Sequence, residues 1–545
     1  MEITGVTYSV SDYEHYAKNG DKNHFEEVID SMIIDGISGM NDSFRKAINS
    51  LPRDQKRMAI LSLLDKDLNL FKRIKALTNK NIGKMEHIKD IILMLREYVK
   101  VGEVEKKKFG EVMTPLELVK EMLATLPEEV WSNPNLKWLD PANGTGPYPI
   151  MVIYKLMNGL AEWEPDAEKR YKHIVENMIY VCELQPKNMF LYMCVVDPFD
   201  AYDLNIYTGS FLEKEFDFHM KNVWGFEKFD ICMGNPPYNE NNSNSNEKIY
   251  FKFINLSFKL LIENGLLCYV LPDDSVSYIV NNEKYQIDYV NANDIVNRYF
   301  KGIGTKILYF LCNKQINHKE TRFIDTKSDL NIDLSKLSVI LMNMDDTFIV
   351  DKIFNYSDDK FSYKFAKYNG NNYRIRFNSI AKTNFSLRGI NMICVDSKLL
   401  RKHNLSPVEF DKNIFKYKVI DHSSDRIEFY ADVNFDNNLK RVCINGIGEI
   451  KPIYDSIGEY LLTDSFVYYE VDDDISANNF ISILDSKISK YLQKVLTHNT
   501  KSKFKILNYL PKLDLTKKWS DDDLYKQFNL TAEEIYKIET VIKSK

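Results

Sequence analysis

The stretch Leu136–Ile150, LKWLDPANGTGPYPI, combines three signals that together predict how this part of the chain folds. The apolar run that ends at Asp140 predicts a strand, and the apolar residues after Gly146 predict a helix. Glycines between a strand and a helix let a ligand approach the backbone closely, and a helix N-terminus favours negative charge. The stretch therefore predicts a ligand-binding turn. An ordinary glycine turn has the same composition, so the prediction needs support from elsewhere in the chain.

Around this turn, residues 100–315 alternate between short apolar runs and amphipathic stretches. The runs MIYVCE (178–183), FDICMG (229–234) and GLLCYVLP (265–272) predict strands, and IYFKFINLSFKLLI (249–262) predicts a helix. Alternating strand and helix patterns favour an α/β fold, in which a mostly parallel sheet carries helices on both faces. Such sheets bind ligands at the carboxyl ends of their strands.

The sequence Asn235-Pro236-Pro237-Tyr238 directly follows one of these predicted strands. The side-chain carbonyl of Asn235 and the main-chain carbonyl of Pro236 can both accept hydrogen bonds from a planar NH2 group. Two such acceptors draw the nitrogen lone pair out of conjugation and direct it at an electrophile. Tyr238 can stack on a base, and the prolines restrict the backbone before a substrate arrives. A turn that merely ends a strand would also favour Asn-Pro and Pro-Pro.

Glu183 ends the predicted strand MIYVCE, where an acidic side chain can bridge the two hydroxyls of a ribose. Most glutamates at strand ends simply face water. The glycine turn does not match the phosphate-binding loop GxxxxGK[ST] and departs from GxGxxG, so neither nucleotide hydrolysis nor NAD binding is indicated.

The 545-residue length and 44% hydrophobic content predict several folded domains. We expect a helical N-terminal region at 1–99, the α/β domain at 100–315, a mixed α/β region at 316–500 and a helical tail at 501–545. Ser520 with Asp523 and Thr531 with Glu534 resemble capping boxes and predict two helix starts in the tail.

The N-terminus shows no signal-peptide pattern, and no apolar run is long enough to span a bilayer, so we expect a cytoplasmic protein without membrane contact. The seven cysteines stand apart without a CxxC pair, and the nine histidines lack ligand spacing. We therefore expect no disulfide bond and no bound metal.

Taken in order, these motifs resemble those of the N6-adenine DNA methyltransferases with an NPPY tetrapeptide, especially the type II and type IIG restriction-modification methylases. Residues 110–115, GEVMTP, are similar to the family's N-terminal cofactor motif, with Met113 in place of an aromatic residue. Residues 140–146 are similar to DPACGSG, with Asn143 and Thr145 in place of cysteine and serine. Residues 209–212, GSFL, are similar to GDFL, although Ser210 replaces the aspartate that contacts the cofactor adenine.

This resemblance implies a Rossmann-like methyltransferase sheet that binds S-adenosyl-L-methionine. It covers roughly residues 105–315 and includes Asn264-Gly265 before the fifth strand. The implied catalytic residues are Asn235, Pro236 and Tyr238. The implied cofactor-binding residues are Thr114, Pro115, Asp140, Ala142, Asn143, Gly144, Gly146, Glu183, Leu184, Ser210, Phe211, Asn235 and Pro237. Pro237, Tyr238 and Phe300 are expected to contact the substrate base, and residues 300–305 are similar to a motif that lines the base pocket.

A basic island at Lys360–Arg388 contains seven lysines and arginines and no acidic residue, in a chain of net charge -6. Within it, NYRIRFN alternates strictly, which places Arg374 and Arg376 on one face of a predicted strand. Arginines on one face can contact phosphates or guanine, so we expect them to bind DNA and residues 316–500 to form the target-recognition domain. A solvated edge strand would use the same charges to prevent aggregation. The polar loop after Tyr238, NENNSNSNE, either orders over DNA or is an ordinary surface loop.

The sequence therefore predicts a site-specific adenine N6-methyltransferase that acts on a flipped-out base of double-stranded DNA, with a separate restriction endonuclease as a further partner. Glu105-Lys106-Lys107 has the spacing of a nuclease ExK motif, but the region before it predicts helices and offers no suitable partner. The chain also lacks the Pro-Cys pair of cytosine C5 methylation. Three alternatives remain: methylation of RNA adenine, methylation of protein glutamine, and a catalytically silent DNA-binding protein.

Overall fold

The computed structural model describes residues 114–543 of the chain. Gaps in this description fall at 198–200, 239–247, 301–304, 317–318, 366, 369–370, 373–383, 388–389, 396–399, 402–403, 408, 410, 421–428, 433–438, 464 and 497–502. The chain forms two compact units, Met1–Lys336 and Leu337–Lys545. The predicted N-terminal helices at 1–99 lie outside the described residues.

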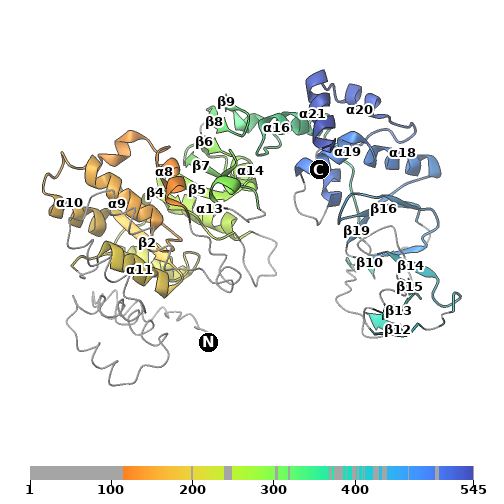
Figure 1. Cartoon of the computed structure of the whole chain (residues 1–545), viewed down its shortest axis with the longest axis horizontal. Coiled ribbons are helices and arrows are strands. Elements are labelled where there is room, and N and C mark those ends of the chain that lie inside the picture. Colours follow the sequence, from red (N-terminus) through yellow and green to blue (C-terminus); the bar gives the residue numbers. More distant parts are fainter. Residues whose placement is uncertain are drawn as a thin grey trace. The chain divides into compact units, whose positions relative to one another are not determined.

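The described part of the first unit contains one large sheet with strand order β3-β2-β1-β4-β5-β7-β6-β8-β9 (Figure 1). Strands β3, β2, β1, β4 and β5 are parallel to one another, whereas β7 lies antiparallel between β5 and β6. The strands are β1 (Trp138–Asp140), β2 (Ile179–Glu183), β3 (Asn205–Thr208), β4 (Phe229–Gly234), β5 (Leu261–Pro272), β6 (Gln286–Asn291), β7 (Ile307–Asn313), β8 (Thr321–Ile324) and β9 (Asp329–Ile332).

Helices lie along this sheet, in orange to green in Figure 1. They are α8 (Leu116–Leu123), α9 (Pro147–Gly159), α10 (Ala167–His173), α11 (Pro186–Val196), α12 (Lys214–His219), α13 (Ile249–Leu260), α14 (Asp274–Tyr278) and α15 (Ile295–Tyr299). Short 3-10 or π turns are η1 (Glu128–Trp131), η2 (Ile174–Met178), η3 (Met220–Trp224), η4 (Ile279–Glu283) and η5 (Leu334–Lys336).

Both faces of the sheet are covered, because successive residues of a strand point to opposite faces and both sets are apolar here. On β5, Cys268 contacts the main-chain carbonyl of Met122 in α8. Its neighbour Tyr269 points the other way and bonds to Ser257 of α13, with 2.6 Å between the hydroxyls. The sequence prediction of an α/β sheet with helices on both faces is confirmed.

Two details differ from the sequence prediction. Asn264-Gly265, expected as a turn before the fifth strand, lies inside β5, where the pairing with β4 shifts register between Phe229 and Ile231. Asn264 adopts a positive φ of 65°, which asparagine tolerates better than most residues. The sheet also continues past the predicted domain boundary at residue 315, because β8 pairs with β6 and β9 pairs with β8.

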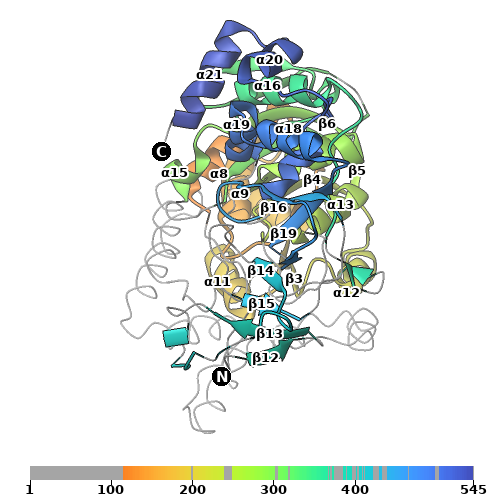
Figure 2. The ribbon, with the colours of Figure 1, turned by 90° about the vertical axis from the view of Figure 1, so that its right-hand side faces the viewer.

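The described part of the second unit contains three sheets and five α-helices (Figure 2). The sheet orders are β12-β13-β15-β14-β18, β17-β16-β19 and β10-β11. The strands are β10 (Lys367–Tyr368), β11 (Asn371–Asn372), β12 (Asn384–Leu387), β13 (Ile390–Cys394), β14 (Tyr417–Ile420), β15 (Phe429–Ala431), β16 (Arg441–Asn445), β17 (Ile453–Asp455), β18 (Tyr460–Leu462) and β19 (Phe466–Glu470). The α-helices are α16 (Met344–Phe354), α18 (Asp474–Leu484), α19 (Lys487–Leu496), α20 (Asp521–Gln527) and α21 (Ala532–Lys543), and η6 (Lys503–Asn508) is a 3-10 helix.

The tail predicted at 501–545 packs into the core of this second unit. Its residues Phe504, Leu507 and Ile538 are buried in the same apolar cluster as Phe480 and Leu492. Both predicted helix starts are confirmed as reciprocal capping boxes. Ser520 exchanges hydrogen bonds with Asp523, and Thr531 does the same with Glu534.

Candidate active site

The glycine turn at the end of β1 has the predicted strand-turn-helix form. β1 ends at the fully buried Asp140, and α9 begins at Pro147, the helix position at which proline is tolerated best. Gly144 and Gly146 adopt positive φ angles of 55° and 90°. A Cβ added at Gly144 would meet nothing within 4 Å, whereas one at Gly146 would collide with the ring of Tyr192. Gly144 thus leaves open space at the turn, and Gly146 permits close packing beneath it.

Glu183, the last residue of β2, holds this turn in place. Its Oε2 accepts a hydrogen bond from the backbone N–H of Gly144 at 2.7 Å, and its Oε1 accepts one from Gln185 at 2.8 Å. The N–H of Asn143 bonds to the carbonyl of Cys182 at 2.9 Å. The carboxylate therefore lies at the glycine turn, and the neighbouring Leu184 is half exposed.

Gly234 brings the end of β4 against the end of β1. The two strands are parallel neighbours, and Leu139 pairs with Cys232. Gly234 has a φ of 150°, and a Cβ there would lie 2.9 Å from Oδ1 of Asp140. Only glycine allows this approach without a shift of neighbouring atoms. The Asn235–Tyr238 turn consequently starts directly beside Asp140.

Asn235 bonds to a residue far away in the sequence. Its Nδ2 donates a hydrogen bond to Oγ1 of Thr114 at 3.1 Å. Thr114 is buried and immediately precedes Pro115, the N-cap of α8. Thr114 and Asn235, both predicted as site residues, are therefore in direct contact.

The other three residues of the tetrapeptide are buried or half-buried. Pro236 is buried, and Pro237 and Tyr238 are half-buried. The Tyr238 hydroxyl donates to the carbonyl of Val270 at 3.4 Å, and its ring meets Tyr250 edge to face with 6.5 Å between centroids. Burial raises the pKa of Tyr238 well above its usual value, so the hydroxyl stays protonated.

Asp140 is a buried carboxylate with incomplete hydrogen bonding. Its Oδ1 accepts from the N–H of Ala142 at 3.1 Å, while its Oδ2 is buried and has no hydrogen-bond partner among the described residues. Burial, with a smaller contribution from Glu183, raises the pKa of this carboxyl well above its usual range. A cation at this position would favour the ionised form.

The predicted residues Ser210, Phe211 and Phe300 have different surroundings. Ser210 is half-buried, and its Oγ accepts from the N–H of Leu212 at 3.2 Å. Phe211 is buried with its ring centroid 5.1 Å from that of Phe216. Phe300 is buried in the main core of the first unit. Two of the three side chains are thus parts of apolar cores.

Several predicted residues fall outside the described parts of the chain. These are Met113 and the residues before it, the loop 239–247, residues 301–302, and Arg374 and Arg376. Two lysines of the basic island have described side chains. Lys364 pairs with Glu470 at 2.6 Å, and Lys360 donates to the carbonyl of Phe354 at 2.5 Å.

Sequence reasoning missed two residues beside the site. The hydroxyl of Tyr148, in the first turn of α9, donates to Sδ of Met122 at 3.2 Å. Tyr250 supports Tyr238 and donates to Oδ1 of Asp274 at 2.6 Å. Both tyrosines lie in predicted helices, where an aromatic residue ordinarily indicates a core position.

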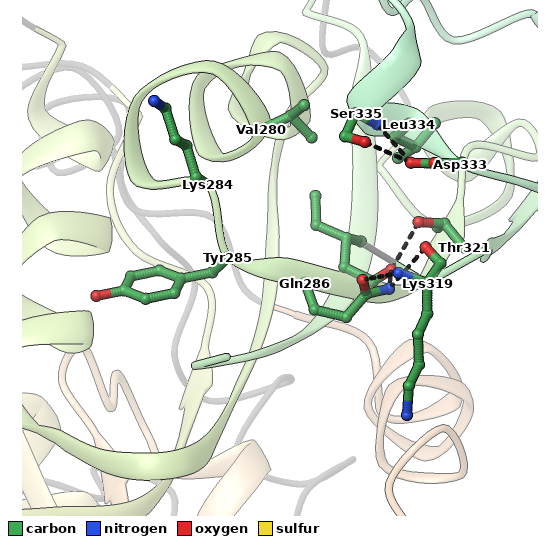
Figure 3. A pocket seen from close by; sticks show the side chains of 10 residues that line it. Val280, Lys284, Tyr285, Gln286, Lys319, Thr321, Asp333, Leu334 and Ser335 are labelled. Atoms are coloured by element: carbon green, nitrogen blue, oxygen red, sulfur yellow. Dashed lines mark hydrogen bonds between the residues drawn. The ribbon is translucent and has the colours of Figure 1, made fainter. Parts of the chain in front are cut away.

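A small pocket lies at a different place in the first unit, between β6, the start of β8 and η5 (Figure 3). Gln286 and Thr321 line it, and both bond to the carbonyl of Ile287, at 2.7 and 2.6 Å. Asp333 accepts a bond from the Ser335 hydroxyl at 2.6 Å. These polar groups bond to neighbouring protein atoms, and none of the predicted site residues lines this pocket.

The described residues include no helix that is both long and apolar enough to cross a membrane.

Comparison with known proteins gives a family match, a curated relative and a set of similar solved structures. Residues 168–301 match the family model described as Eco57I restriction-modification methylase. An uncharacterized adenine-specific methylase of Mycoplasma pneumoniae is 26% identical over 230 residues, which cover 30% of this chain and 54% of that one. The chain thus spans about half the length of this curated relative.

Among solved structures, an ATP-dependent Type ISP restriction-modification enzyme, LlaBIII, bound to DNA has a TM-score of 0.46. It is 11% identical, and the match covers 93% of this chain and 44% of that one. A class I S-adenosylmethionine-dependent methyltransferase of Listeria monocytogenes has a TM-score of 0.32 at 15% identity, covering 48% and 80%.

The matched segment contains Glu183, Ser210 and Asn235–Tyr238, which are among the residues that carry the predicted resemblance. Residues 168–301 of this chain are therefore similar to the Eco57I restriction-modification methylases, as the motifs predicted.

Proposed function

We propose that this protein is a site-specific DNA methyltransferase that transfers a methyl group from S-adenosyl-L-methionine to the N6 amino group of adenine. The observation that carries the proposal is the position of Asn235. It directly follows β4, beside the buried Asp140 and the glycine turn, with its amide bonded to Thr114. The family match over residues 168–301 and the adenine-specific methylase of Mycoplasma pneumoniae support the choice of adenine.

The residues at the strand ends fit the proposed cofactor. Asp140 carries a buried oxygen without a partner in the described chain, and it offers a negative charge to the cationic part of S-adenosylmethionine. The open space at Gly144 leaves room for close approach to the backbone. Glu183 lies at the same turn, within reach of a ribose. The proposed cofactor-binding set also includes Pro115, Ala142, Asn143, Leu184, Ser210 and Pro237.

When bound, S-adenosylmethionine supplies an electrophilic methyl group on a sulfonium. The protein's proposed part is to bind and polarise the amine. The side-chain carbonyl of Asn235 and the main-chain carbonyl of Pro236 accept the two N–H hydrogens of the adenine amino group, which leaves the nitrogen lone pair available. Tyr238 stacks on the base after it has left the duplex. No covalent bond to the enzyme is required, because the amine is the nucleophile.

DNA is the proposed substrate class because a large second unit accompanies the catalytic one, and its sequence contains the basic island Lys360–Arg388. We propose that Arg374 and Arg376 contact the DNA and that a restriction endonuclease acts as a partner. The carbonyl acceptors of Asn235 and Pro236 could also bind the amino group of an RNA adenine or of a glutamine amide, since each presents a planar NH2 group.

Transfer of a radiolabelled methyl group to DNA, RNA and protein substrates tests the proposal. We expect label in DNA only, recovered as N6-methyladenine. Asn235→Ala should reduce kcat by about 10²- to 10³-fold, the usual cost of removing one oriented hydrogen-bonding group from an active site. Cofactor binding should persist in this variant. Full activity of Asn235→Ala, or label in RNA or protein alone, contradicts the proposal.

A further inference from the structure

The orientation of the Tyr238 ring depends on contacts with β5 and α13. Its hydroxyl donates to the carbonyl of Val270 at 3.4 Å, whereas a hydroxyl hydrogen bond is usually about 2.7 Å long. Its ring also packs against the main core of the first unit, but apolar packing does not by itself select a ring plane. The ring of Tyr250 in α13 supplies a contact that does. The two rings meet at 82° with 6.5 Å between their centroids, the edge-to-face geometry that aromatic pairs prefer.

The Tyr250 ring is itself fixed by a hydrogen bond to a carboxylate. Tyr250 is 3% exposed, and its hydroxyl donates to Oδ1 of Asp274 at 2.6 Å, the short distance of a bond to a charged acceptor. Burial, with a smaller contribution from Asp274, raises the pKa of Tyr250, so the hydroxyl keeps the hydrogen that it donates. Asp274 is the first residue of α14, which follows β5. The bond therefore ties α13 to the segment that begins at the end of β5.

The second oxygen of Asp274 has a different partner. Its Oδ2 accepts from Nζ of Lys248, and the side chains of Lys248 and Asp274 are 51% and 39% exposed. An ion pair this exposed contributes little to stability. Nζ of Lys248 also lies 5.5 Å from the centroid of the Tyr250 ring. Lys248 and Tyr250, both from the start of α13, therefore bond to the two oxygens of one carboxylate.

We propose that Tyr250 and Asp274 are positioning residues that hold the Tyr238 ring in the plane in which it stacks on the substrate base. This inference rests on the proposed function, which assigns the stacking role to Tyr238. Asp274 fixes the Tyr250 phenol, and the edge-to-face contact passes this orientation on to Tyr238. Stacking requires nearly parallel planes, so a Tyr238 ring that rotates loses contact with the base.

Three single variants of the full-length protein test the bond between Tyr250 and Asp274. Tyr250→Phe keeps the ring and removes the hydroxyl, and kcat/KM for DNA should fall about 5- to 20-fold. Asp274→Ala should cause a similar loss, because Tyr250 then lacks its acceptor. Asp274→Asn keeps an acceptor oxygen at this position and should recover most of the activity. The cofactor Kd, measured by titration calorimetry, should change less than about twofold in all three.

Double variants test whether the effect passes through Tyr238. In the Tyr238→Ala background the ring to be positioned is absent, so adding Tyr250→Phe should change kcat/KM less than about twofold. The double variant Tyr250→Phe with Asp274→Ala should be no less active than either single variant, because both substitutions break the same bond. A structural role of Tyr250 that is independent of Tyr238 predicts instead that the losses of Tyr250→Phe and Tyr238→Ala multiply.

Tyr278→Phe is the matched control. Tyr278 stacks on Phe251, the neighbour of Tyr250, with 4.0 Å between centroids, and its hydroxyl bonds to the side chain of Asn255. The control removes one phenol hydroxyl, as Tyr250→Phe does, and should keep kcat/KM within about twofold of wild type. Thermal unfolding of each variant separates misfolding from loss of orientation. If Tyr250→Phe does not fold, Asp274→Ala decides: wild-type kcat/KM in that variant overturns the inference.

Two results overturn the inference while the proposed function stands: wild-type kcat/KM in Tyr250→Phe, or losses that multiply fully with Tyr238→Ala. If the wild-type protein transfers no methyl group to DNA, the proposed function fails instead. The ring position can then be read from the NMR signals of protein labelled with ¹³C-tyrosine, in which the signal of Tyr238 is the one that disappears in Tyr238→Phe. A shift of this signal in Asp274→Ala supports the positioning of Tyr238, and an unchanged signal overturns it.

Discussion

Asp140 in the first unit and Asp455 in the second are both fully buried, yet their surroundings differ. Asp455 pairs with the buried Arg441, with Oδ2 3.0 Å from Nε, and its Oδ1 also accepts from the N–H of Glu459 at 2.8 Å. Asp140 accepts one backbone N–H, and its Oδ2 has no partner among the described residues. A buried carboxylate that is paired with a cation and fully hydrogen-bonded is part of the folded core. A buried carboxylate oxygen without such a partner indicates a place where a ligand can supply the missing hydrogen bond or charge.

The largest effect should come from breaking the complete pair. Arg441→Met leaves Asp455 buried without its cation and removes the bond from Arg441 to the carbonyl of Tyr460 in β18. We expect the free energy of unfolding to fall by about 3–5 kcal/mol, as when one partner of a buried ion pair is removed. Chemical denaturation monitored by circular dichroism measures this change.

Two controls sharpen this test. Arg322→Met removes an ion pair with Asp329 in which the two side chains are 56% and 50% exposed. This substitution should leave stability almost unchanged. Replacing both partners, as in Arg441→Met with Asp455→Leu, should recover much of the loss, because no lone charge then stays buried. Equal stability of Arg441→Met and wild type would contradict the structural role of the pair.

A second, smaller effect is expected where the strand ends meet. Gly234→Ala places a Cβ 2.9 Å from Oδ1 of Asp140 and forces a side chain into a φ of 150°. Backbone strain of this kind costs about 1–3 kcal/mol. We also expect methyl transfer to fall more than stability alone explains, because Asn235 is the next residue. Denaturation and kinetic assays on the same sample compare the two losses.

Gly225→Ala is the matched control for this substitution. Gly225 has a φ of 78° at the C-cap of η3, and an added Cβ there meets nothing within 4 Å. It should lose about 1 kcal/mol of stability without any specific loss of activity. If Gly234→Ala behaved in the same way as this control, close approach of β4 to Asp140 would have no catalytic importance.

The smallest effect concerns Oδ2 of Asp140, which has no hydrogen-bond partner among the residues that the structure describes. Asp140→Asn keeps the shape and removes the charge, and without ligand it should stabilise the protein by about 1 kcal/mol, because no buried charge then has to be desolvated. Cofactor affinity should decrease in the same variant, because the negative charge is lost. Thermal unfolding and calorimetric titration measure the two opposite changes.

The raised pKa of Asp140 predicts the direction in which the stability of the folded protein changes with pH. Burial raises the pKa of Asp140, so the folded protein keeps this proton to a higher pH than the unfolded chain does. Stability is therefore lost as pH rises from the usual carboxyl range through the raised pKa. Asp140→Asn should lack this decline, and saturating S-adenosylmethionine should weaken it in the wild type. An identical pH profile in both proteins would contradict the argument.

Much of the candidate active site could be predicted from local sequence. The strands that end at Asp140, Glu183 and Gly234 each stand before a polar or glycine-rich turn, and parallel strands bring such ends to one edge of a sheet. The antiparallel insertion of β7 could not be predicted, because its sequence ILYFLCN is as apolar as a parallel central strand. The prediction of a turn at Asn264-Gly265 was wrong because asparagine followed by glycine is favoured both in a turn and at an irregularity inside a strand.

Other features depend on contacts between distant segments. Thr114 and Asn235 are 121 positions apart, and nothing in either segment alone indicates that they bond. The sequence around Tyr148 predicts an ordinary helix, and the sequence around Arg441 predicts an ordinary strand. Neither sequence indicates the specific hydrogen bonds that the two buried side chains make.

The sequence by itself determined the alternation of strands and helices, the position of the glycine turn and the Asn235–Tyr238 turn, and the helix starts of the tail. These depend on neighbours within a few residues, where periodicity and backbone preferences act directly. Only the tertiary structure decided that Asn235 bonds to Thr114 and that Asp455, rather than Asp140, pairs with a cation among the described residues. Both depend on where distant donors and acceptors meet, and hydrogen bonding acts through distance and angle in space.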